Sequence, residues 1–540
     1  MAGLAAAFGA GAMTNSVEEI EDTDTILVIG SNTTSQHPMI ASRVIRAKHK
    51  GAKLVVIDPR RIPLVEYADL FVRPRPGTNV ALLNGMLRII IEKGLIDSQF
   101  IEAQTEGFAE LKAKVSEYTP QRVEEITGVD PDLLERAAVL YGQADRAMIL
   151  YAMGITQQTA GTDNVKAVAN LALATGNLGR YGTGVNPLRG QNNVQGACDM
   201  GALPDVLTAY KKVAEAKERQ RFAEAWSLPV PETPGLTVGE MLQAANKGEL
   251  KGLYVVGENP LISDPDVSHV QEALQNLDLL VVQDIFMTET AMLADVVLPG
   301  ASFAEKEGTF TNTDRRVQRV RQAIEPIGDS KPDWQIVCQL AGHLGAKGFD
   351  FASPSEVMQE IASVTPSYGG ITYERLDRGE VLQWPCPDLS HPGTKYLHAN
   401  GFPRGKGKFH AVDHTPPAEA PDAEYPYILS TGRIPFHFHG GSMSMRIERL
   451  QQEAPEGFVD IHPDNAKQLQ VHSGDQVSVR SRRGEIQVKV RITDEVEPNV
   501  VFIPMHYPES PVNKLTDSRV DPVAKIPNFK VCAVNIQKPA

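Results

Sequence analysis

An arginine in the middle of a segment rich in glycine and side-chain amides is the clearest candidate for direct ligand chemistry. The segment runs from Thr175 to Gly201 and contains the run Arg189-Gly-Gln-Asn-Asn-Val-Gln. It offers little apolar mass to a core and holds more amides than a surface loop needs. A guanidinium matches a carboxylate in bidentate geometry and keeps its charge. Arg189, with Gln191 beside it, therefore predicts a site for a small carboxylate, although a structural ion pair with a protein carboxylate fits the same chemistry equally well.

Polar residues at the ends of short apolar runs form a second set of candidates. Gly30-Ser-Asn32 follows one such run and Asp58 follows the next, while Gly257-Glu-Asn259 and Gln283-Asp284 repeat the arrangement later in the chain. In open α/β sheets, ligands bind at the carboxyl ends of the strands. Backbone N–H groups there can bind a phosphate, and a carboxylate can accept hydrogen bonds from a ribose or a purine. Taken singly, each motif is also compatible with an ordinary tight turn.

The elements that must position these residues alternate between strand and helix. Residues 25–30 and 53–57 are apolar runs typical of buried parallel strands, and a helical stretch over 38–50 connects them. Such a βαβ unit has a right-handed crossover almost without exception. Strand patterns return at 253–256, 279–282 and 295–298. We therefore expect two doubly wound, dinucleotide-binding-like α/β domains.

The character of the chain changes toward its end. Apolar and polar residues alternate over 477–490 about a turn at 482–484, which predicts a β-hairpin, and 499–503 predicts a further strand. A β-barrel is expected there. The predicted domains are residues 1–190, an α/β domain; 191–400, a second α/β domain that lacks its N-terminal part; 401–424, a Pro- and Gly-rich linker or surface crossing; and 425–540, the barrel.

Composition excludes several classes of protein. The net charge of −14 argues against a sequence-independent grip on nucleic acid or anionic membrane. The apolar runs, such as 87–91, are much shorter than the roughly 20 residues of a membrane-spanning helix. The four cysteines stand far apart, at Cys198, Cys338, Cys386 and Cys532. They predict neither a metal site made by this chain alone nor a disulfide framework, and they fit a cytoplasmic location.

Several motifs resemble the formate dehydrogenase branch of the molybdopterin oxidoreductase family. The most specific is the run from Arg189 to Gly201. Further matching segments are Gly11-Ala-Met-Thr-Asn15, Ile57-Asp-Pro-Arg60, Val282-Gln-Asp-Ile-Phe-Met-Thr288, Ala294-Asp-Val-Val-Leu-Pro299 and Leu429-Ser-Thr-Gly-Arg433. The resemblance extends essentially from Ala2 to Val534.

The resemblance implies two molybdopterin guanine dinucleotides that together bind one molybdenum or tungsten atom. The first would lie on the first α/β domain, near Gly30, Asn32, Asp58, Arg60, Gly77 and Gly154. The second would lie on the second α/β domain, near Gly257, Glu258, Gln283, Asp284, Thr288 and Asp333. The barrel would contact both through Thr431, Arg433, His437, Asn513 and Lys530. Arg189 resembles the family's active-site arginine, which orients formate, and no residue of this chain is expected to bind the metal.

The resemblance also implies oxidation of formate to CO₂, or the reverse, with the two electrons leaving through an iron–sulfur cluster to partner subunits with iron–sulfur or flavin centres. Family members begin with a segment that binds a [4Fe–4S] cluster, followed by a selenocysteine or cysteine metal ligand and a histidine, before the position of Ala2. We expect these parts to be missing here and the 540 residues alone to be inactive. A selenocysteine UGA codon read as a stop would give such a chain. The alternatives are a split enzyme and a non-catalytic structural or electron-transfer subunit of the same fold.

Overall fold

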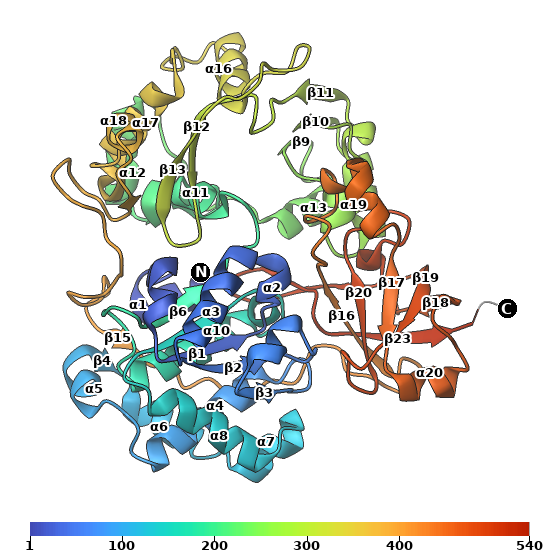
Figure 1. Ribbon diagram of the computed structural model, residues 1–540. Helices are drawn as coiled ribbons and strands as arrows, with labels where there is room; N and C mark the ends of the chain where they lie inside the picture. The colour runs from blue at the N-terminus through green and yellow to red at the C-terminus, as the bar shows by residue number, and fades with distance from the viewer. Residues whose placement is uncertain (539–540) are drawn as a thin grey trace. The chain divides into compact units, whose positions relative to one another are not determined.

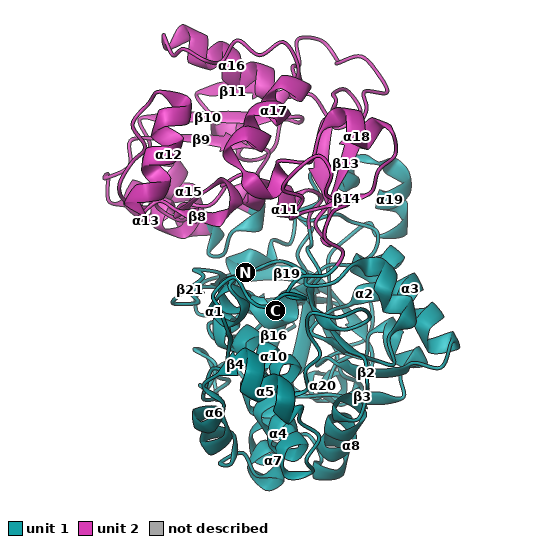
Figure 2. Cartoon of the chain, turned by 90° about the vertical axis from the view of Figure 1, so that its left-hand side faces the viewer, with its two compact units in different colours: residues 1–190, 262–267, 396–540 teal, residues 191–261, 268–395 magenta. Residues whose placement is uncertain are grey.

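The computed structural model describes residues 1–538 (Figure 1). The predicted strands at 25–29 and 53–57 are neighbours in a parallel sheet. The chain divides into two units (Figure 2). Unit 1 consists of residues 1–190, 262–267 and 396–540, and unit 2 of residues 191–261 and 268–395. The first α/β domain and the barrel thus belong to one unit.

The first α/β domain is built on a five-stranded parallel sheet in the order β3-β2-β1-β5-β6. Its strands are β1 (Thr25–Ile29), β2 (Lys53–Ile57), β3 (Leu70–Val72), β5 (Ala147–Tyr151) and β6 (Gly184–Pro187). Alternate residues of β1 enter two separate cores, Leu27 and Ile29 on one face, Ile26 and Val28 on the other. Both faces are buried, which explains the unbroken apolar runs.

Helices cover both faces of this sheet. One core contains residues of α4 (Asn79–Glu92), α8 (Pro131–Gly142) and α10 (Gly161–Ala174), and the opposite core contains residues of α3 (Pro38–His49). Strand β1 pairs with β2 on one side and with β5 on the other, so the winding reverses between β1 and β5. Such a reversal opens a crevice at the carboxyl ends of the strands, where ligands bind.

The end of the chain forms the predicted barrel. Its six strands close in the order β16-β20-β17-β19-β18-β23. They are β16 (Tyr427–Gly432), β17 (Phe458–Ile461), β18 (Gln476–Arg480), β19 (Glu485–Ile492), β20 (Val500–Pro504) and β23 (Cys532–Gln537). The predicted hairpin is β18 and β19, whose alternate valines and isoleucines fill the barrel. In unit 1 the barrel is tied to the first α/β domain by Asp521, which accepts hydrogen bonds from the backbone N–H (2.8 Å) and hydroxyl (2.7 Å) of Thr162.

Residues 401–424, predicted to be a linker, pack against the first α/β domain. Strand β15 (Gly407–Lys408) pairs with β4 (Thr105–Glu106), and Phe402, Phe409 and Val412 are buried in the core that contains α4 and α10. The Pro- and Gly-rich composition reflects an irregular path over the domain, and the segment is not a free spacer. Unit 2 accordingly ends at Lys395, before the predicted boundary at 400.

Unit 2 contains a three-stranded parallel sheet of β9 (Gly252–Val256), β10 (Leu279–Asp284) and β11 (Val296–Pro299), with β10 in the middle. Helices α13 (Val238–Asn246) and α15 (Val267–Gln275) bury one face of this sheet. An antiparallel sheet of β12 (Gly308–Thr311), β13 (Arg316–Val320) and β14 (Leu382–Gln383) completes the unit. The predicted α/β class with a barrel is thus confirmed. Among residues 1–538, no helix combines the length and apolar character needed to cross a membrane.

Candidate functional site

Two predicted glycines touch at the point where the winding of the first sheet reverses. Gly30 follows β1 with a φ of 58°, and Gly154 follows β5. The N–H of Gly154 donates to the carbonyl of Gly30 (3.0 Å), and a Cβ on Gly154 would lie 2.7 Å from the Gly30 Cα. Only glycine permits both the left-handed backbone and this approach. The crevice therefore has a floor of bare backbone, which suits close contact with a phosphate or a flat ring.

Asp58 and Arg60 lie at the carboxyl end of the neighbouring strand β2. The Oδ1 of Asp58 accepts a hydrogen bond from the N–H of Arg60 (2.9 Å). Burial raises the pKa of Asp58 to about 6 against the attraction of Arg60 and Lys530. The guanidinium of Arg60 lies over the Phe502 ring of the barrel, 3.5 Å from its centroid. A buried carboxylate with free acceptor capacity is suited to binding N–H or O–H groups of a base or ribose.

The barrel contributes two further cations to this part of unit 1. Lys530 donates from Nζ to the carbonyl of Thr431 (2.6 Å), and burial together with Arg433 lowers its pKa to about 8. Arg433 donates to the carbonyl of Gly190 (3.3 Å), and burial lowers its pKa as well. Buried cations that repel one another favour an anion between them.

Buried polar atoms without a hydrogen-bond partner lie on the same elements. They are Nε of Arg60, Nδ1 of His37 and Nε2 of Gln36, the last two at the end of the short helix α2 (Thr33–Gln36) that follows Gly30. Buried polar groups are normally satisfied, so a polar ligand bound here would find unused hydrogen-bonding atoms. The bare backbone, the cations and these atoms together fit a phosphate-containing dinucleotide.

Arg189 follows β6 and lies at the end of unit 1. Its Nη2 donates to the carbonyl of Gly11 (2.9 Å), while its own carbonyl contacts Nε2 of His37 (2.7 Å). Because a carbonyl only accepts, His37 carries its proton on Nε2, and burial lowers its pKa and keeps it neutral. The helix α2 that follows Gly30 is therefore linked to the backbone of Arg189. Gln191 is the first residue of unit 2.

Two histidines near Arg433 were not predicted. His506 accepts at Nε2 from the N–H of Ile434 (3.0 Å) and donates from Nδ1 to the carbonyl of His439. Burial lowers the pKa of both His506 and His439 to about 4, so both are neutral near pH 7. Their contacts join barrel loops that lie far apart in the sequence, and only the pair His437 and His439 hinted at them.

Three predicted barrel residues are bound by the protein itself. Thr431 donates to the carbonyl of Phe529 (2.9 Å). His437 has both ring nitrogens engaged, by the hydroxyl of Ser444 (3.3 Å) and the carbonyl of Ala454 (2.9 Å). Asn513 donates to the carbonyls of residues 262 (2.8 Å) and 263 (3.1 Å), and so fastens the 262–267 segment to the barrel.

The remaining predicted positions of unit 1 differ in their surroundings. Asn32 precedes helix α2 and accepts from the hydroxyl of Thr34 (3.2 Å), directly after the Gly30 turn. Gly77, with a φ of 87°, lies beyond β3 at the edge of the sheet, where a Cβ would clash with the ring of Pro417. The structure therefore brings Gly30, Asn32 and Gly154 together, while Gly77 packs against Pro417 of residues 401–424.

In unit 2, four predicted residues meet at the carboxyl end of the parallel sheet. The N–H of Gly257 donates to the carbonyl of Gln283 (2.8 Å), and the Nε2 of Gln283 donates to the Oδ1 of Asp333 (2.7 Å). Asp333 also pairs with Lys306, which was not predicted. Asp284 ends β10 and accepts at Oδ1 from the following N–H (2.7 Å). A carboxylate and an amide on adjacent elements provide the acceptors and donors that the edge of a purine requires.

The other two predicted residues of unit 2 border this cluster. Glu258 accepts at Oε1 from the N–H of Asn259 (3.1 Å) and is exposed. Thr288 is buried, and its hydroxyl accepts from the N–H of Ala291 (3.3 Å). Asn259 links the two loops, because its Oδ1 accepts from the hydroxyl of Thr290 (2.8 Å).

Comparison with known proteins identifies this arrangement. Residues 4–343 match the family model for molybdopterin oxidoreductase. The chain belongs to that family. A second model, for the molybdopterin dinucleotide binding domain, matches residues 427–533, which contain most of the barrel. The resemblance inferred from the sequence is confirmed.

Two relatives of this molybdopterin oxidoreductase are formate dehydrogenase proteins. It is 52% identical over 539 residues to the F420-dependent formate dehydrogenase subunit alpha of Methanocaldococcus jannaschii, covering 99% of this chain and 80% of that protein. It is 40% identical over 543 residues to formate dehydrogenase H of Escherichia coli, covering 99% of this chain and 76% of that protein. Acetylene hydratase from Pelobacter acetylenicus has the same fold, with a TM-score of 0.80 and 21% identity over 100% of this chain and 80% of that one.

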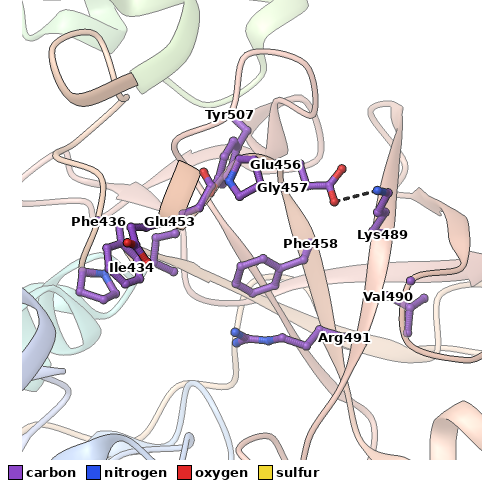
Figure 3. Close-up of a pocket in the computed structure, with 14 residues that line it drawn as sticks. Ile434, Phe436, Glu453, Glu456, Gly457, Phe458, Lys489, Val490, Arg491 and Tyr507 are labelled. Carbon is purple, nitrogen blue, oxygen red and sulfur yellow. Dashed lines mark hydrogen bonds and ion pairs between the residues drawn. The ribbon is translucent and has the colours of Figure 1, made fainter. Parts of the chain in front are cut away.

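A pocket of about 430 Å³ lies on the barrel of this oxidoreductase (Figure 3). Ile434, Phe458 and Tyr507 line it together with Lys489 and Arg491. Both cations are already paired, since Lys489 bonds to Glu456 (2.7 Å) and Arg491 to Asp460 (2.5 Å). Asp460 also lies 3.6 Å from Arg60, so the pocket and the cation cluster share this carboxylate. Ile434 and Tyr507 of the lining follow Arg433 and His506 in the sequence.

Proposed function

We propose that this chain forms the cofactor-binding body of a formate dehydrogenase, which interconverts formate and CO₂ plus two electrons. The observation that carries the proposal is Arg189, a cation at the end of β6 whose backbone is held by His37. Arg189 belongs to unit 1, which also contains Gly30, Asp58 and Arg60. The relatives named as formate dehydrogenases at 40–52% identity support the same substrate.

The residues present fit two molybdopterin guanine dinucleotides. The first dinucleotide would be held in unit 1, with Arg433 and Lys530 neutralising the charge of its phosphates. Its other contacts would be Gly30, Asn32, Asp58, Arg60 and Gly154. The second dinucleotide would be held in unit 2 by Gly257, Gln283, Asp284 and Asp333, with Glu258 and Thr288 beside them. When bound, this group supplies a molybdenum or tungsten centre that accepts two electrons.

The contribution of the chain to the reaction is positioning. A guanidinium at Arg189 binds the carboxylate of formate through two parallel, charge-assisted hydrogen bonds, which fixes the direction of the C–H bond. Gln191 offers an amide for a further hydrogen bond to the same substrate. The neutral His37 orients the Arg189 backbone without adding a second charge that would compete for formate.

The proposal places the protein ligand of the metal and the [4Fe–4S] cluster outside residues 1–540, because the four cysteines are widely separated in the sequence. The electrons would pass to a partner subunit with iron–sulfur or flavin centres. Three relatives are named F420-dependent, so F420 is the acceptor we propose. The wide spacing of the cysteines, which indicates no disulfide framework, supports a cytoplasmic location.

Substitution of Arg189 in the full-length, cofactor-loaded protein tests the proposal. Arg189→Ala is expected to lower kcat/KM for formate on the order of 100-fold or more, since charge-assisted bidentate pairs are the strong class of hydrogen bond. Metal and nucleotide content should remain normal. Arg180→Ala is the matched control, because Arg180 lies in the same glycine-rich segment but pairs with Asp145 at the surface (3.3 Å).

Formate oxidation with an artificial electron-accepting dye provides the measurement. Near-normal turnover by Arg189→Ala would overturn the assignment. Absence of formate oxidation in the loaded wild-type protein would favour instead a non-catalytic subunit of the same fold.

A further inference from the structure

A buried carboxylate in unit 2 collects hydrogen bonds immediately after the glycine- and amide-rich loop. Asp199 ends helix α11 (Val194–Asp199) and is 1% exposed. Tyr368 donates to its Oδ2 (2.6 Å), while Tyr210 (2.7 Å) and Gln195 (2.8 Å) donate to its Oδ1. The carboxylate therefore has donors on both oxygens. Burial raises its pKa although these hydrogen bonds lower it.

Tyr368 also connects Asp199 to Asn193, at the end of the glycine- and amide-rich loop, by way of Thr311. The hydroxyl of Tyr368 contacts that of Thr311 (3.3 Å), on strand β12. The N–H of Thr311 donates to the Oδ1 of Asn193 (2.9 Å), the residue that precedes α11. Figure 1 shows α11 beside β12. The contacts thus form a closed ring, which runs from Asn193 through Thr311, Tyr368 and Asp199 and back along helix α11 to Asn193.

The backbone of the loop adopts a conformation that needs support from outside the loop. Asn193 has a φ of 58°, in the left-handed region that a residue with a side chain seldom adopts. A Cβ on Gly196 would clash with the Oδ1 of Asn193, so a larger residue there would displace the side chain that accepts from Thr311. A six-residue helix contributes little stability of its own, and its end must be held by tertiary contacts.

We propose that Asp199 and Tyr368 are positioning residues for the active-site loop, and that they fix the backbone from Gln191 to Asn193 through the ring that includes Thr311. This inference rests on the proposed function, in which Gln191 binds formate. Tyr210 donates to the same carboxylate, but its hydroxyl accepts from the amide of Gln195 (2.8 Å) within α11. Its hydroxyl therefore stabilises Asp199 and the helix, whereas that of Tyr368 links Asp199 to β12.

This asymmetry between the two tyrosines gives a matched pair of variants. Tyr368→Phe removes the hydroxyl that bridges Asp199 and Thr311, and Tyr210→Phe removes the hydroxyl that bridges Asp199 and Gln195. Both keep the aromatic ring. In the full-length, cofactor-loaded protein, Tyr368→Phe is expected to lower kcat/KM for formate about tenfold, because small displacements of positioning groups have large effects on rate. Tyr210→Phe is expected to change it less than about threefold.

A double-mutant cycle with Gln191→Ala separates positioning from general destabilisation. If Tyr368 acts through the loop, Tyr368→Phe adds little to the loss that Gln191→Ala already causes, since coupled residues are non-additive. Fully additive losses, or equal losses in the two tyrosine variants, would overturn the proposal. Melting temperature and metal content of each variant establish that folding and loading are retained.

Hydrogen–deuterium exchange of the backbone N–H groups of residues 191–193 tests the ring without any activity. Faster exchange in Tyr368→Phe than in Tyr210→Phe supports the proposal, and equal protection in both refutes it. Should the wild-type protein fail to oxidise formate, the proposed function falls. The exchange measurement would still decide whether the ring holds the loop.

Discussion

The N–H of Gly154 donates to the carbonyl of Gly30 across 3.0 Å, so the turns that follow β5 and β1 are in direct backbone contact. The two residues are more than 120 positions apart in the sequence. Their contact closes the sheet at the point where its winding reverses and leaves a surface without side chains. A ligand can approach this backbone more closely than it could approach any side chain.

Gly154→Ala is expected to lower the nucleotide content of the protein severalfold. The new Cβ would lie 2.7 Å from the Gly30 Cα and carbonyl oxygen, and the two turns would have to separate. Quantification of GMP released from purified protein by acid provides the measurement. Gly239→Ala is the control, because Gly239 lies in helix α13 with open space within 4 Å of the position that a Cβ would take. Equal nucleotide content in both variants would show that the crevice is not the binding surface.

Asp333→Asn is expected to remove much of the second nucleotide. The substitution replaces an acceptor of the Gln283 amide with a group that also carries N–H donors, and it breaks the ion pair with Lys306. Because the Asp333 side chain is partly exposed, loss of its charge should cost roughly 1 kcal/mol, or about fivefold in affinity. GMP per chain should fall from two toward one. Asp329→Asn, at an exposed carboxylate nearby in the sequence, should leave it unchanged.

Local patterns in the sequence predict the scaffold and much of the first cluster. Apolar runs identify β1 and β2 because each strand is buried on both faces, and the turn residues Gly30 and Asp58 follow directly from the strand ends. The contacts of His37, His439 and His506 could not be predicted in this way. Each depends on loops brought together by the whole fold, and the sequence does not specify which carbonyl a histidine will meet.

For residues 401–424, amino-acid composition predicts only part of the structure. Proline and glycine predict an irregular path, which is correct, but they do not report whether that path is packed. The decisive residues are Asn170 and Asn84, whose side chains bond to the backbone of this segment from buried helices. A buried amide in a largely apolar helix needs a polar partner, and here the partner is the backbone of residues 401–424.

Asn170→Ala is expected to release this segment and to destabilise the first α/β domain. Asn170 is fully buried, donates to the carbonyl of His410 (2.8 Å) and accepts from its N–H (3.0 Å). Two backbone groups would lose their partners, at about 2–4 kcal/mol in total. Limited proteolysis should then cut between residues 401 and 424, a segment that should resist cleavage in the wild type. Asn276→Ala, which removes an exposed amide, serves as the control. Equal resistance in Asn170→Ala would mean that apolar packing of Phe402 and Phe409 alone holds the segment.

The stability of the cofactor-free protein is expected to depend on pH through Asp58. Burial raises the pKa of this carboxyl from 3.8 to about 6. The folded state therefore binds more protons than the unfolded state between these two values, and stability falls as pH rises through that window and then levels off. The difference between the two pKa values corresponds to roughly 3 kcal/mol.

Asp58→Asn removes this titration while it keeps the size of the side chain and an acceptor for the N–H of Arg60. The variant should therefore gain melting temperature relative to the wild type as pH rises from about 4.5 to about 6.5, and the difference should stay constant above about pH 7. Thermal unfolding of the two cofactor-free proteins across this range is the measurement. A difference that does not change with pH would show that Arg60 and Lys530 offset the burial of Asp58, whose carboxylate would then be ionised throughout. In that case the cations would be neutralised before the dinucleotide binds, and its phosphates would gain less from Lys530 than its position suggests.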